Sequence, residues 1–206
     1  ATIANDAIIA GAVPALGTLC SSIANARVRT SGTIGGNLCF AEPRADPPVL
    51  LAALDAQLVL KSARGEHHIS ASRFIIGALE TLRAPDELLL RIEIPVTACD
   101  IRYERVVFGH RTIAGAAAAI PKDPANKPRI WVGCIGTHPT SLPTTERYIS
   151  ANPASLDDGL THAIATDIGT LDIVSDEDAS ADYRRHLAET VTRRAITAAA
   201  DKKGIP

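Results

Sequence analysis

Between residues 3 and 26, apolar residues recur every three or four positions, which is the spacing of one face of an α-helix. They are Ile3, Ala7, Ile8, Ala12, Leu16, Leu19, Cys20 and Ile23. Glycine and proline interrupt the pattern at residues 11–14, so it predicts one or two short helices. A further helix is expected over about residues 47–54, because Asp46 followed by proline is a favourable helix start and the carboxylate can act as N-cap.

Alternating apolar and polar positions predict β-strands in the middle of the chain. Residues 57–61 and 67–70 flank a turn sequence at 63–66, which is typical of a β-hairpin. Residues 88–94 alternate in the same way and stop at Pro95, which cannot continue a ladder. Three more strands are expected at residues 101–108, 114–120 and 129–135, with a polar turn between the last two.

Helical patterns dominate the remainder of the chain, at residues 142–150, 155–167 and 180–202. We expect Ser155 to open the second of these helices, Ser180 to open the last and Gly204 to close it. The last helix has an apolar stripe that should be buried, made of Ala179, Tyr183, Leu187, Val191 and Ala195. The charged residues off this stripe should be solvated; they are Arg184, Arg185, Glu189, Arg193 and Lys202.

Composition limits the function classes. The chain has 206 residues, 46% of them hydrophobic but only 3% aromatic, so its core must consist of aliphatic residues. The formal net charge of −2 does not favour nucleic acid or an anionic membrane. No apolar run reaches the roughly 18 residues that a membrane span needs, and the first residues do not resemble a signal peptide, so we expect a cytoplasmic protein.

Metal binding is not expected. The cysteines at 20, 39, 99 and 134 are far apart and form no C-x-x-C pair. His67 and His68 fall on opposite faces of one predicted strand, so we interpret them as surface residues. Hydrolase, zinc-protease and nucleotide-binding P-loop motifs are also missing from the sequence.

The most informative stretch is Thr33-Ile34-Gly35-Gly36-Asn37. Glycines let another group come close to the main chain, and successive bare N–H groups form a concave donor surface suited to phosphate oxygens. Thr33 and Asn37 add polar side chains at its edges. The plain alternative is a glycine-rich turn between a strand and a helix.

This stretch extends into a longer motif. The chain has V-R-x-x-G-T-I-G-G-N-L at residues 28–38, followed by an A-E-P-x-x-D sequence that ends at Asp46. It resembles the FAD-binding flavoprotein subunit of the molybdenum hydroxylases, the xanthine dehydrogenase and carbon monoxide dehydrogenase family. The chain departs from the family pattern at Glu42, where the family often has Asp, and at Thr30 and Ser31.

A second motif supports the resemblance, because residues 180–195 are similar to the family's A-x-Y-R-x-x-L…R-R-A helix. The resemblance implies an α+β fold: residues 1–97 would be the second half of a PCMH-type FAD-binding domain with an antiparallel sheet and helices. Residues 98–206 would be the three-strand, three-helix C-terminal domain of the flavoprotein. The family's A-G-G-T-D-L turn is not matched, so we expect an upstream subdomain to be missing.

The resemblance also implies the site residues. Thr33, Ile34, Gly35, Gly36 and Asn37 would wrap the FAD diphosphate and ribityl region, and Asp46 would accept a hydrogen bond from the adenosine ribose. Further residues implied to line or approach the cofactor are Ile23, Ala24, Leu88, Leu89 and Arg105. No catalytic side chain is implied, because the flavin itself carries the redox chemistry. The structural alternatives are that Leu88 and Leu89 are ordinary core leucines and that Arg105 is simply solvated.

The implied function is electron transfer from iron–sulfur clusters through FAD to an acceptor such as NAD or a quinone. A molybdopterin-binding large subunit and a [2Fe–2S] small subunit are implied as partners; their cofactors do not belong to this chain. One alternative is a flavin-free binding or assembly module that keeps the fold. Another is a flavoprotein of the wider vanillyl-alcohol-oxidase type, against which the C-terminal domain argues.

Overall fold

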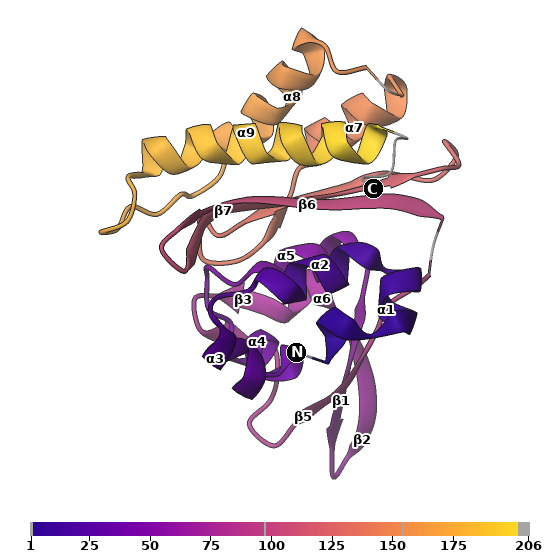
Figure 1. Cartoon of the computed structure of the whole chain (residues 1–206), viewed down its shortest axis with the longest axis vertical. Coiled ribbons are helices and arrows are strands. Elements are labelled where there is room, and N and C mark those ends of the chain that lie inside the picture. The colour runs from indigo at the N-terminus through magenta and orange to yellow at the C-terminus, as the bar shows by residue number, and fades with distance from the viewer. Residues whose placement is uncertain (1, 97, 154, 202–206) are drawn as a thin grey trace.

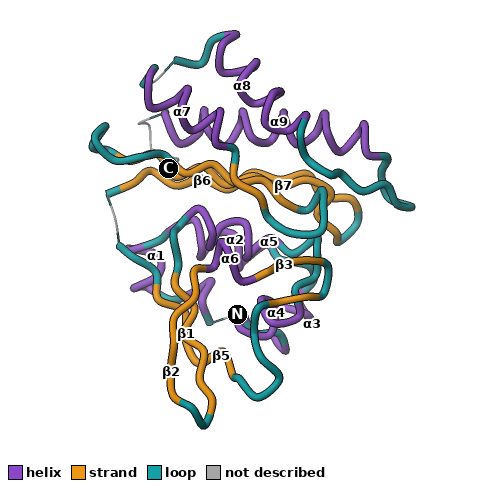
Figure 2. The backbone as a smooth tube through the Cα atoms, turned by 180° about the vertical axis from the view of Figure 1, so that it is seen from behind, coloured by secondary structure: helices purple, strands orange, loops and turns teal. Residues whose placement is uncertain are grey.

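The computed structural model describes residues 2–96, 98–153 and 155–201. Its centre is a four-stranded antiparallel sheet in the order β6-β7-β8-β9 (Figure 1). Helices from the C-terminal half cover one face of this sheet, and helices from the N-terminal half cover the other. A smaller three-stranded sheet extends beyond the N-terminal helices, as the view from behind in Figure 2 also shows.

Short helices build the N-terminal half: η1 (Ile3–Asn5), α1 (Ala7–Ala12), α2 (Pro14–Ser22), α3 (Ala26–Ser31), α4 (Ile34–Phe40) and α5 (Asp46–Ala53). Asp6 caps α1 by accepting hydrogen bonds from the N–H groups of Ile8 and Ile9. Val13 separates α1 from α2, so the predicted break in this region is confirmed.

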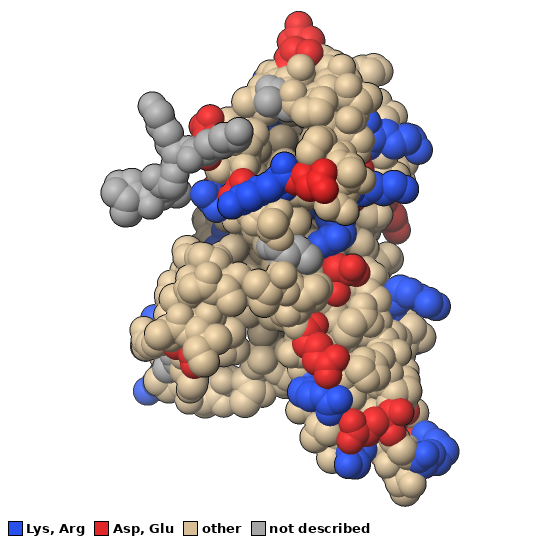
Figure 3. All heavy atoms as spheres, turned by 90° about the vertical axis from the view of Figure 1, so that its right-hand side faces the viewer, with Lys and Arg blue, Asp and Glu red and all other residues tan. Residues whose placement is uncertain are grey.

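The smaller sheet has the order β2-β1-β5 and consists of β1 (Gln57–Ser62), β2 (Gly65–Ser70) and β5 (Leu88–Glu93). The predicted hairpin and the strand before Pro95 are therefore confirmed. Between them lie α6 (Ala71–Phe74), β3 (Ile75–Gly77) and β4 (Glu80–Thr81). Acidic and basic side chains are interspersed on the face shown in Figure 3, and the hairpin carries exposed ion pairs such as Lys61–Glu66 and Arg64–Asp86.

The central sheet consists of β6 (Cys99–Phe108), β7 (Arg111–Pro121), β8 (Arg129–Gly133) and β9 (Thr140–Ser141). The three predicted strands are confirmed, whereas the short β9 was not predicted. The strand predicted at residues 101–108 begins two residues earlier, at Cys99. Alternate alanines of β7 face different cores: Ala116 and Ala118 face the C-terminal helices, while Ala117 and Ala119 face the N-terminal half.

Paired glycines let the central sheet approach its neighbours closely. Gly115 of β7 and Gly133 of β8 are directly opposite each other. A Cβ atom on Gly115 would lie 2.2 Å from the Tyr103 hydroxyl oxygen, and one on Gly133 would lie 2.4 Å from a methyl group of Val49 in α5. These positions therefore need glycine for space: Gly115 makes room for the Tyr103 side chain, and Gly133 lets α5 approach β8.

The C-terminal helices are α7 (Pro143–Ala151), α8 (Asp158–Gly169) and α9 (Ala181–Ala200). Ser180 caps α9 as predicted, but Asp157 rather than Ser155 caps α8, because its carboxylate accepts from the N–H of Leu160. The prediction for Arg184 is wrong: its side chain is completely buried, whereas Tyr183 on the predicted apolar stripe is 51% exposed. The predicted helix end at Lys202 and Gly204 lies outside the described residues.

Candidate functional site

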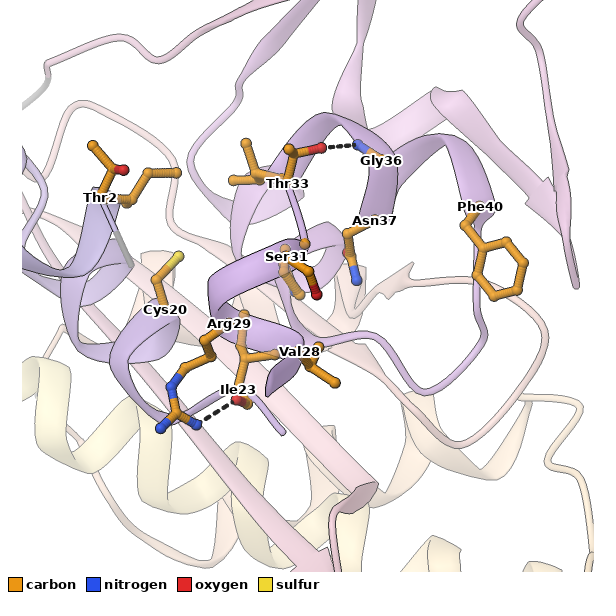
Figure 4. A pocket seen from close by; sticks show the side chains of 14 residues that line it. Thr2, Cys20, Ile23, Val28, Arg29, Ser31, Thr33, Gly36, Asn37 and Phe40 are labelled. Carbon is orange, nitrogen blue, oxygen red and sulfur yellow. Dashed lines mark hydrogen bonds between the residues drawn. The ribbon is translucent and has the colours of Figure 1, made fainter. Parts of the chain in front are cut away.

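A cavity of about 660 Å³ opens between η1, α2, α3, α4 and the start of α5. Figure 4 shows its lining, with Thr2 and Cys20 on one side and the residues of α3 and α4 on the other. Five of the residues predicted from the sequence line it, namely Ile23, Thr33, Ile34, Gly36 and Asn37. These residues come from separate elements, so the fold brings most of the glycine-rich motif to one concave surface.

The glycine-rich stretch forms the first turn of α4. Thr33 is the N-cap, and its hydroxyl oxygen accepts a hydrogen bond of 2.9 Å from the N–H of Gly36. The plain alternative, a turn between a strand and a helix, is wrong, because helix α3 precedes the stretch and neither Gly35 nor Gly36 has a positive φ. The first helical turn still presents N–H groups without intrahelical acceptors, as every helix start does.

Asn37 lines the cavity and carries an unusual polar atom. Its side-chain oxygen is buried and has no hydrogen-bond partner among the described residues. A buried carbonyl oxygen without a donor is costly, by roughly 1–3 kcal/mol, so such atoms are rare in native proteins. The side chain lies beside Ser31 and Thr33 in Figure 4, at the cavity that Asn37 lines.

Arg29 fixes the chain segment that follows α2. Its guanidinium donates to the carbonyl oxygen of Ile23 at 2.9 Å, as Figure 4 shows. It also donates to the carbonyl oxygen of Ala24 at 3.1 Å. Ala24 has a φ of +43°, a conformation that costs free energy for a residue with a side chain. Ala24 supports the cavity wall through this backbone contact, and Ile23 lines the cavity.

Asp46 lies in a buried polar cluster next to the cavity. The prediction that it is an N-cap is wrong: Ala45 is the N-cap, and Asp46 is the first residue of α5. The carboxylate of Asp46, only 5% exposed, accepts a hydrogen bond of 2.7 Å from the Tyr103 hydroxyl and pairs with the Arg105 guanidinium. The carboxylate is therefore held by two side chains of β6 instead of by its own helix.

Electrostatics within this cluster are dominated by burial. Burial raises the pKa of the Tyr103 phenol well above its ordinary value, and nearby Cys134 and Asp46 act in the same direction. Burial likewise raises the pKa of the Cys134 thiol. Both groups are therefore neutral at pH 7.

Arg105 also connects the cluster to the cavity wall. Its second terminal nitrogen donates to the carbonyl oxygen of Ser22 at 2.6 Å, directly before Ile23. The end of α2 is thus held by Arg105 at Ser22 and by Arg29 at Ile23 and Ala24. The alternative of a merely solvated cation is wrong, because Arg105 pairs with Asp46 and donates to Ser22. That Arg105 lies close to the flavin stays a prediction.

The two leucines of β5 have different positions. Leu89 packs toward α4, since a Cβ atom on Gly35 would lie 3.8 Å from its side chain. Leu88 is 74% exposed and points away, because successive strand residues face opposite sides. Leu88 therefore does not line the cavity. The alternative that Leu88 is an ordinary core leucine is also wrong, because its side chain is exposed.

Sequence reasoning missed Tyr103, Arg29 and Phe40 as residues of this region. Tyr103 is hard to find, since a tyrosine on a predicted strand carries no local sign that its hydroxyl meets Asp46. Arg29 stands within the quoted motif, so its position beside the glycine-rich stretch was the available signal.

Two further results concern other classes of site. No described helix combines the length and the apolar character needed to cross a membrane. Over residues 2–96, 98–153 and 155–201, no three His, Cys, Asp or Glu side chains come together in a way that could hold a metal ion. His67 and His68 instead lie on the surface, near Glu87 and Glu93 respectively.

Comparison with family models divides the chain into two matched regions. Residues 1–97 match the FAD binding domain in molybdopterin dehydrogenase, and residues 111–199 match the CO dehydrogenase flavoprotein C-terminal domain. The cavity and Asp46 lie in the first region, whereas Tyr103 lies between the two and α9 lies in the second.

Individual relatives agree with this result. The chain is 32% identical to the caffeine dehydrogenase subunit beta of a Pseudomonas species over 96% of its own length and 69% of that protein. It is 31% identical to the glyceraldehyde dehydrogenase medium chain of Sulfolobus acidocaldarius, over 94% of this chain and 70% of that one.

Solved structures show the same fold. Quinoline 2-oxidoreductase from Pseudomonas putida 86 superposes with a TM-score of 0.87 at 27% identity, over 96% of this chain and 70% of that chain. Reconstituted CO dehydrogenase from Oligotropha carboxidovorans gives a TM-score of 0.88 at 25% identity, over 98% of this chain and 72% of that chain.

Proposed function

Because this chain belongs to the family of FAD-binding medium subunits of molybdenum hydroxylase-type dehydrogenases, we propose that it transfers electrons from iron–sulfur clusters through FAD to an acceptor such as NAD or a quinone. FAD, when bound, supplies the redox chemistry, and the protein supplies binding, orientation and electrostatics. The observation that carries the site assignment is the cavity at the glycine-rich stretch, with its unpartnered Asn37 oxygen.

The polar groups of the cavity fit a ligand that combines hydroxyl groups with a diphosphate. The Asn37 side-chain oxygen is an acceptor, so it needs a donor such as a ribityl or ribose hydroxyl. The Thr33 hydroxyl already accepts from Gly36, and it keeps its own hydrogen to donate to a phosphate oxygen. The N–H groups at the start of α4 add further donors next to Thr33.

Asp46 is proposed to act together with Arg105 and Tyr103. Each carboxylate oxygen carries two lone pairs, so Asp46 can accept from a ribose hydroxyl while it still holds its two protein partners. Arg105 then pairs with Asp46 and fixes the end of α2 at the same time. Leu89 is proposed to support α4 from behind, and Leu88 remains a candidate contact only on the exposed face of β5.

We propose that residues 1–97 contribute to FAD binding and that residues 98–206 form the flavoprotein C-terminal domain. The matched regions, residues 1–97 and 111–199, support this division. We propose that the partners are a molybdopterin-binding large subunit and an iron–sulfur small subunit. The names of several relatives, such as "medium chain", support an assembly with larger and smaller subunits.

The proposal is tested by loading the full-length subunit with FAD and recording the flavin absorbance after gel filtration. We expect retained flavin and a weaker Kd for Asn37→Ala, by roughly fivefold, because one hydrogen bond is worth about 1 kcal/mol. Asn152→Ala is the matched control, since Asn152 lies on the surface at the end of α7, away from the cavity lining.

Two results would contradict this assignment. A folded subunit that retains no flavin would favour the flavin-free module. Equal Kd values for the two asparagine variants would remove Asn37 from the site and leave the bound cofactor to be placed elsewhere.

A further inference from the structure

Arg184 is a completely buried cation on α9, remote in sequence from the cavity. One terminal nitrogen of its guanidinium donates to the carbonyl oxygens of Ile113 at 2.9 Å and Cys134 at 3.0 Å. The other donates to both carboxylate oxygens of Asp176, at 2.8 and 2.7 Å. Burial of an arginine is costly unless it is paired and hydrogen-bonded, and these contacts with Ile113, Cys134 and Asp176 meet that requirement.

One connection leads from Arg184 through Asp176 to the FAD-binding half of the chain. Asp176 also pairs with Arg44, and Arg44 pairs in addition with Asp178. The side chains of Arg44 and Asp178 are only 15% and 16% exposed, so solvent screens their interaction weakly. Arg44 stands two residues before Asp46, so this chain of ion pairs ends at the start of α5.

A second connection runs through Cys134. Its φ is +64°, an unfavourable value for a residue with a side chain, and Arg184 holds its carbonyl oxygen in that conformation. The Cys134 thiol consequently lies 3.7 Å from the carbonyl oxygen of Ala45 and 4.0 Å from a carboxylate oxygen of Asp46. Arg184 is therefore connected to Arg44 through Asp176, and to Ala45 and Asp46 through Cys134.

We propose that Arg184 is a positioning residue for the FAD site: through Asp176 and Cys134 it fixes residues 44–46, and it thereby couples the seating of the C-terminal helices to cofactor affinity. This inference rests on the function proposed above and deepens it. Coupling of this kind is reciprocal, so bound FAD also strengthens the attachment of α9 to the central sheet.

A purely structural role for Arg184 makes a different prediction. It would lower the stability of the subunit on substitution and leave the FAD Kd of the folded protein unchanged. Positioning, in contrast, changes the Kd and the visible circular dichroism of the bound flavin, because the segment beside the cofactor moves. These two readouts separate the roles.

The main experiment compares Arg184→Lys with Arg185→Lys in the full-length subunit. Arg185 is the matched control, since it neighbours Arg184 on α9 and donates to the carbonyl oxygen of Ile168 at 2.7 Å, far from residues 44–46. Lysine keeps the charge but cannot donate to Ile113, Cys134 and Asp176 in the same fork geometry. We expect at least a fivefold higher FAD Kd and altered flavin dichroism for Arg184→Lys, and less than a twofold change in Kd for Arg185→Lys.

A double-substitution cycle tests the connection itself. Arg44→Lys should weaken FAD binding in the wild-type background and weaken it less in an Asp176→Asn background, where Arg44 keeps only its pair with Asp178. These substitutions also serve if Arg184→Lys does not fold, because Arg44 and Asp176 are less buried than Arg184.

The possible outcomes are distinct. An unchanged FAD Kd in a folded Arg184→Lys subunit, or equal Kd changes for the two lysine variants, would overturn the inference and leave the proposed function intact. Additive effects of Arg44→Lys and Asp176→Asn would also overturn it. A wild-type subunit that binds no FAD would refute the proposed function and this inference with it.

Discussion

Asp46→Asn is the substitution that best separates the observed structure from the simple reading of the sequence. An N-cap aspartate can be replaced by asparagine at a cost of about 0.5 kcal/mol or less, because both residues cap well. The structure instead places the carboxylate in a buried pair with Arg105 and in a hydrogen bond with Tyr103. The two arrangements therefore predict different losses of stability.

The magnitude follows from what remains after the substitution. Removing one partner of a buried ion pair typically costs 3–5 kcal/mol. Arg105 is 17% exposed at its side chain and keeps its bond to the Ser22 carbonyl oxygen, and the new amide oxygen can still accept from Tyr103. We therefore expect a loss of about 2–3 kcal/mol in the free energy of unfolding.

Urea denaturation of the full-length subunit without FAD, followed by circular dichroism at pH 7, measures this quantity. Asp6→Asn is the matched control, since Asp6 is a genuine N-cap on α1 and should lose about 0.5 kcal/mol or less. A loss for Asp46→Asn no larger than that for Asp6→Asn would refute the view that the carboxylate is held by Arg105 and Tyr103.

Three further predictions concern the same region. Gly36→Val places a Cβ atom 3.0 Å from the Thr33 hydroxyl oxygen. We therefore expect a loss of about 1 kcal/mol in the free energy of unfolding and a roughly tenfold higher FAD Kd in titrations. Gly11→Val is the control and should leave the Kd unchanged, because no atom lies within 4 Å of a Cβ at that position. Gly115→Ala must displace the Tyr103 hydroxyl from Asp46, so urea denaturation should show a loss of about 2–3 kcal/mol in the free energy of unfolding. Gly169→Ala is the control and should not lower this free energy, because a Cβ at residue 169 meets no other atom. The pKa of the Asp176 carboxyl is about 2. Desolvation acts to raise this pKa, but the hydrogen bonds from Arg184 and from the N–H groups of Asp178 and Ala179 outweigh desolvation and lower it. This folded-state pKa lies below the ordinary value of 3.8. The contribution of ionised Asp176 to the free energy of unfolding is therefore fully present above about pH 4 and is lost as the pH falls toward 2. With solvent screening taken into account, we expect this contribution to be about 1–2 kcal/mol. Asp176→Asn should therefore flatten the dependence of the free energy of unfolding on pH between pH 4 and 2. An unchanged slope would contradict the pairing of Asp176 with Arg184.

Local patterns were sufficient for much of the secondary structure. The hairpin of β1 and β2, the strand β5 before Pro95 and the long α9 are set by alternation, turn residues and capping over a few neighbouring positions. The glycine-rich motif and the helix after Asp46 were found for the same reason, since their signals are contiguous in the sequence. The sequence also supported the family resemblance, because two motifs occur far apart in the correct order.

The conformation of the glycine-rich stretch was not determined at this level. Glycines are compatible with both a turn and a helix, and the hydroxyl of Thr33 caps either. The contact of α4 with β5 and the wall of the cavity favour the helix. A short segment with weak local preference takes the conformation that its neighbours allow, so tertiary structure decided this case.

Tertiary structure alone decided the roles of the charged residues. Asp46 meets Tyr103 and Arg105, which are 57 and 59 residues away in the sequence, and Arg184 meets Cys134 at a separation of 50. We predicted that Arg184 is solvated because it lies off the apolar stripe of the helix and because a charge is costly to bury. No local sequence pattern indicates the distant partners that offset this cost. The sequence by itself therefore determined which elements form and to which family the motifs point, whereas long-range packing determined which charges are buried, which partners neutralise them and how they support the site.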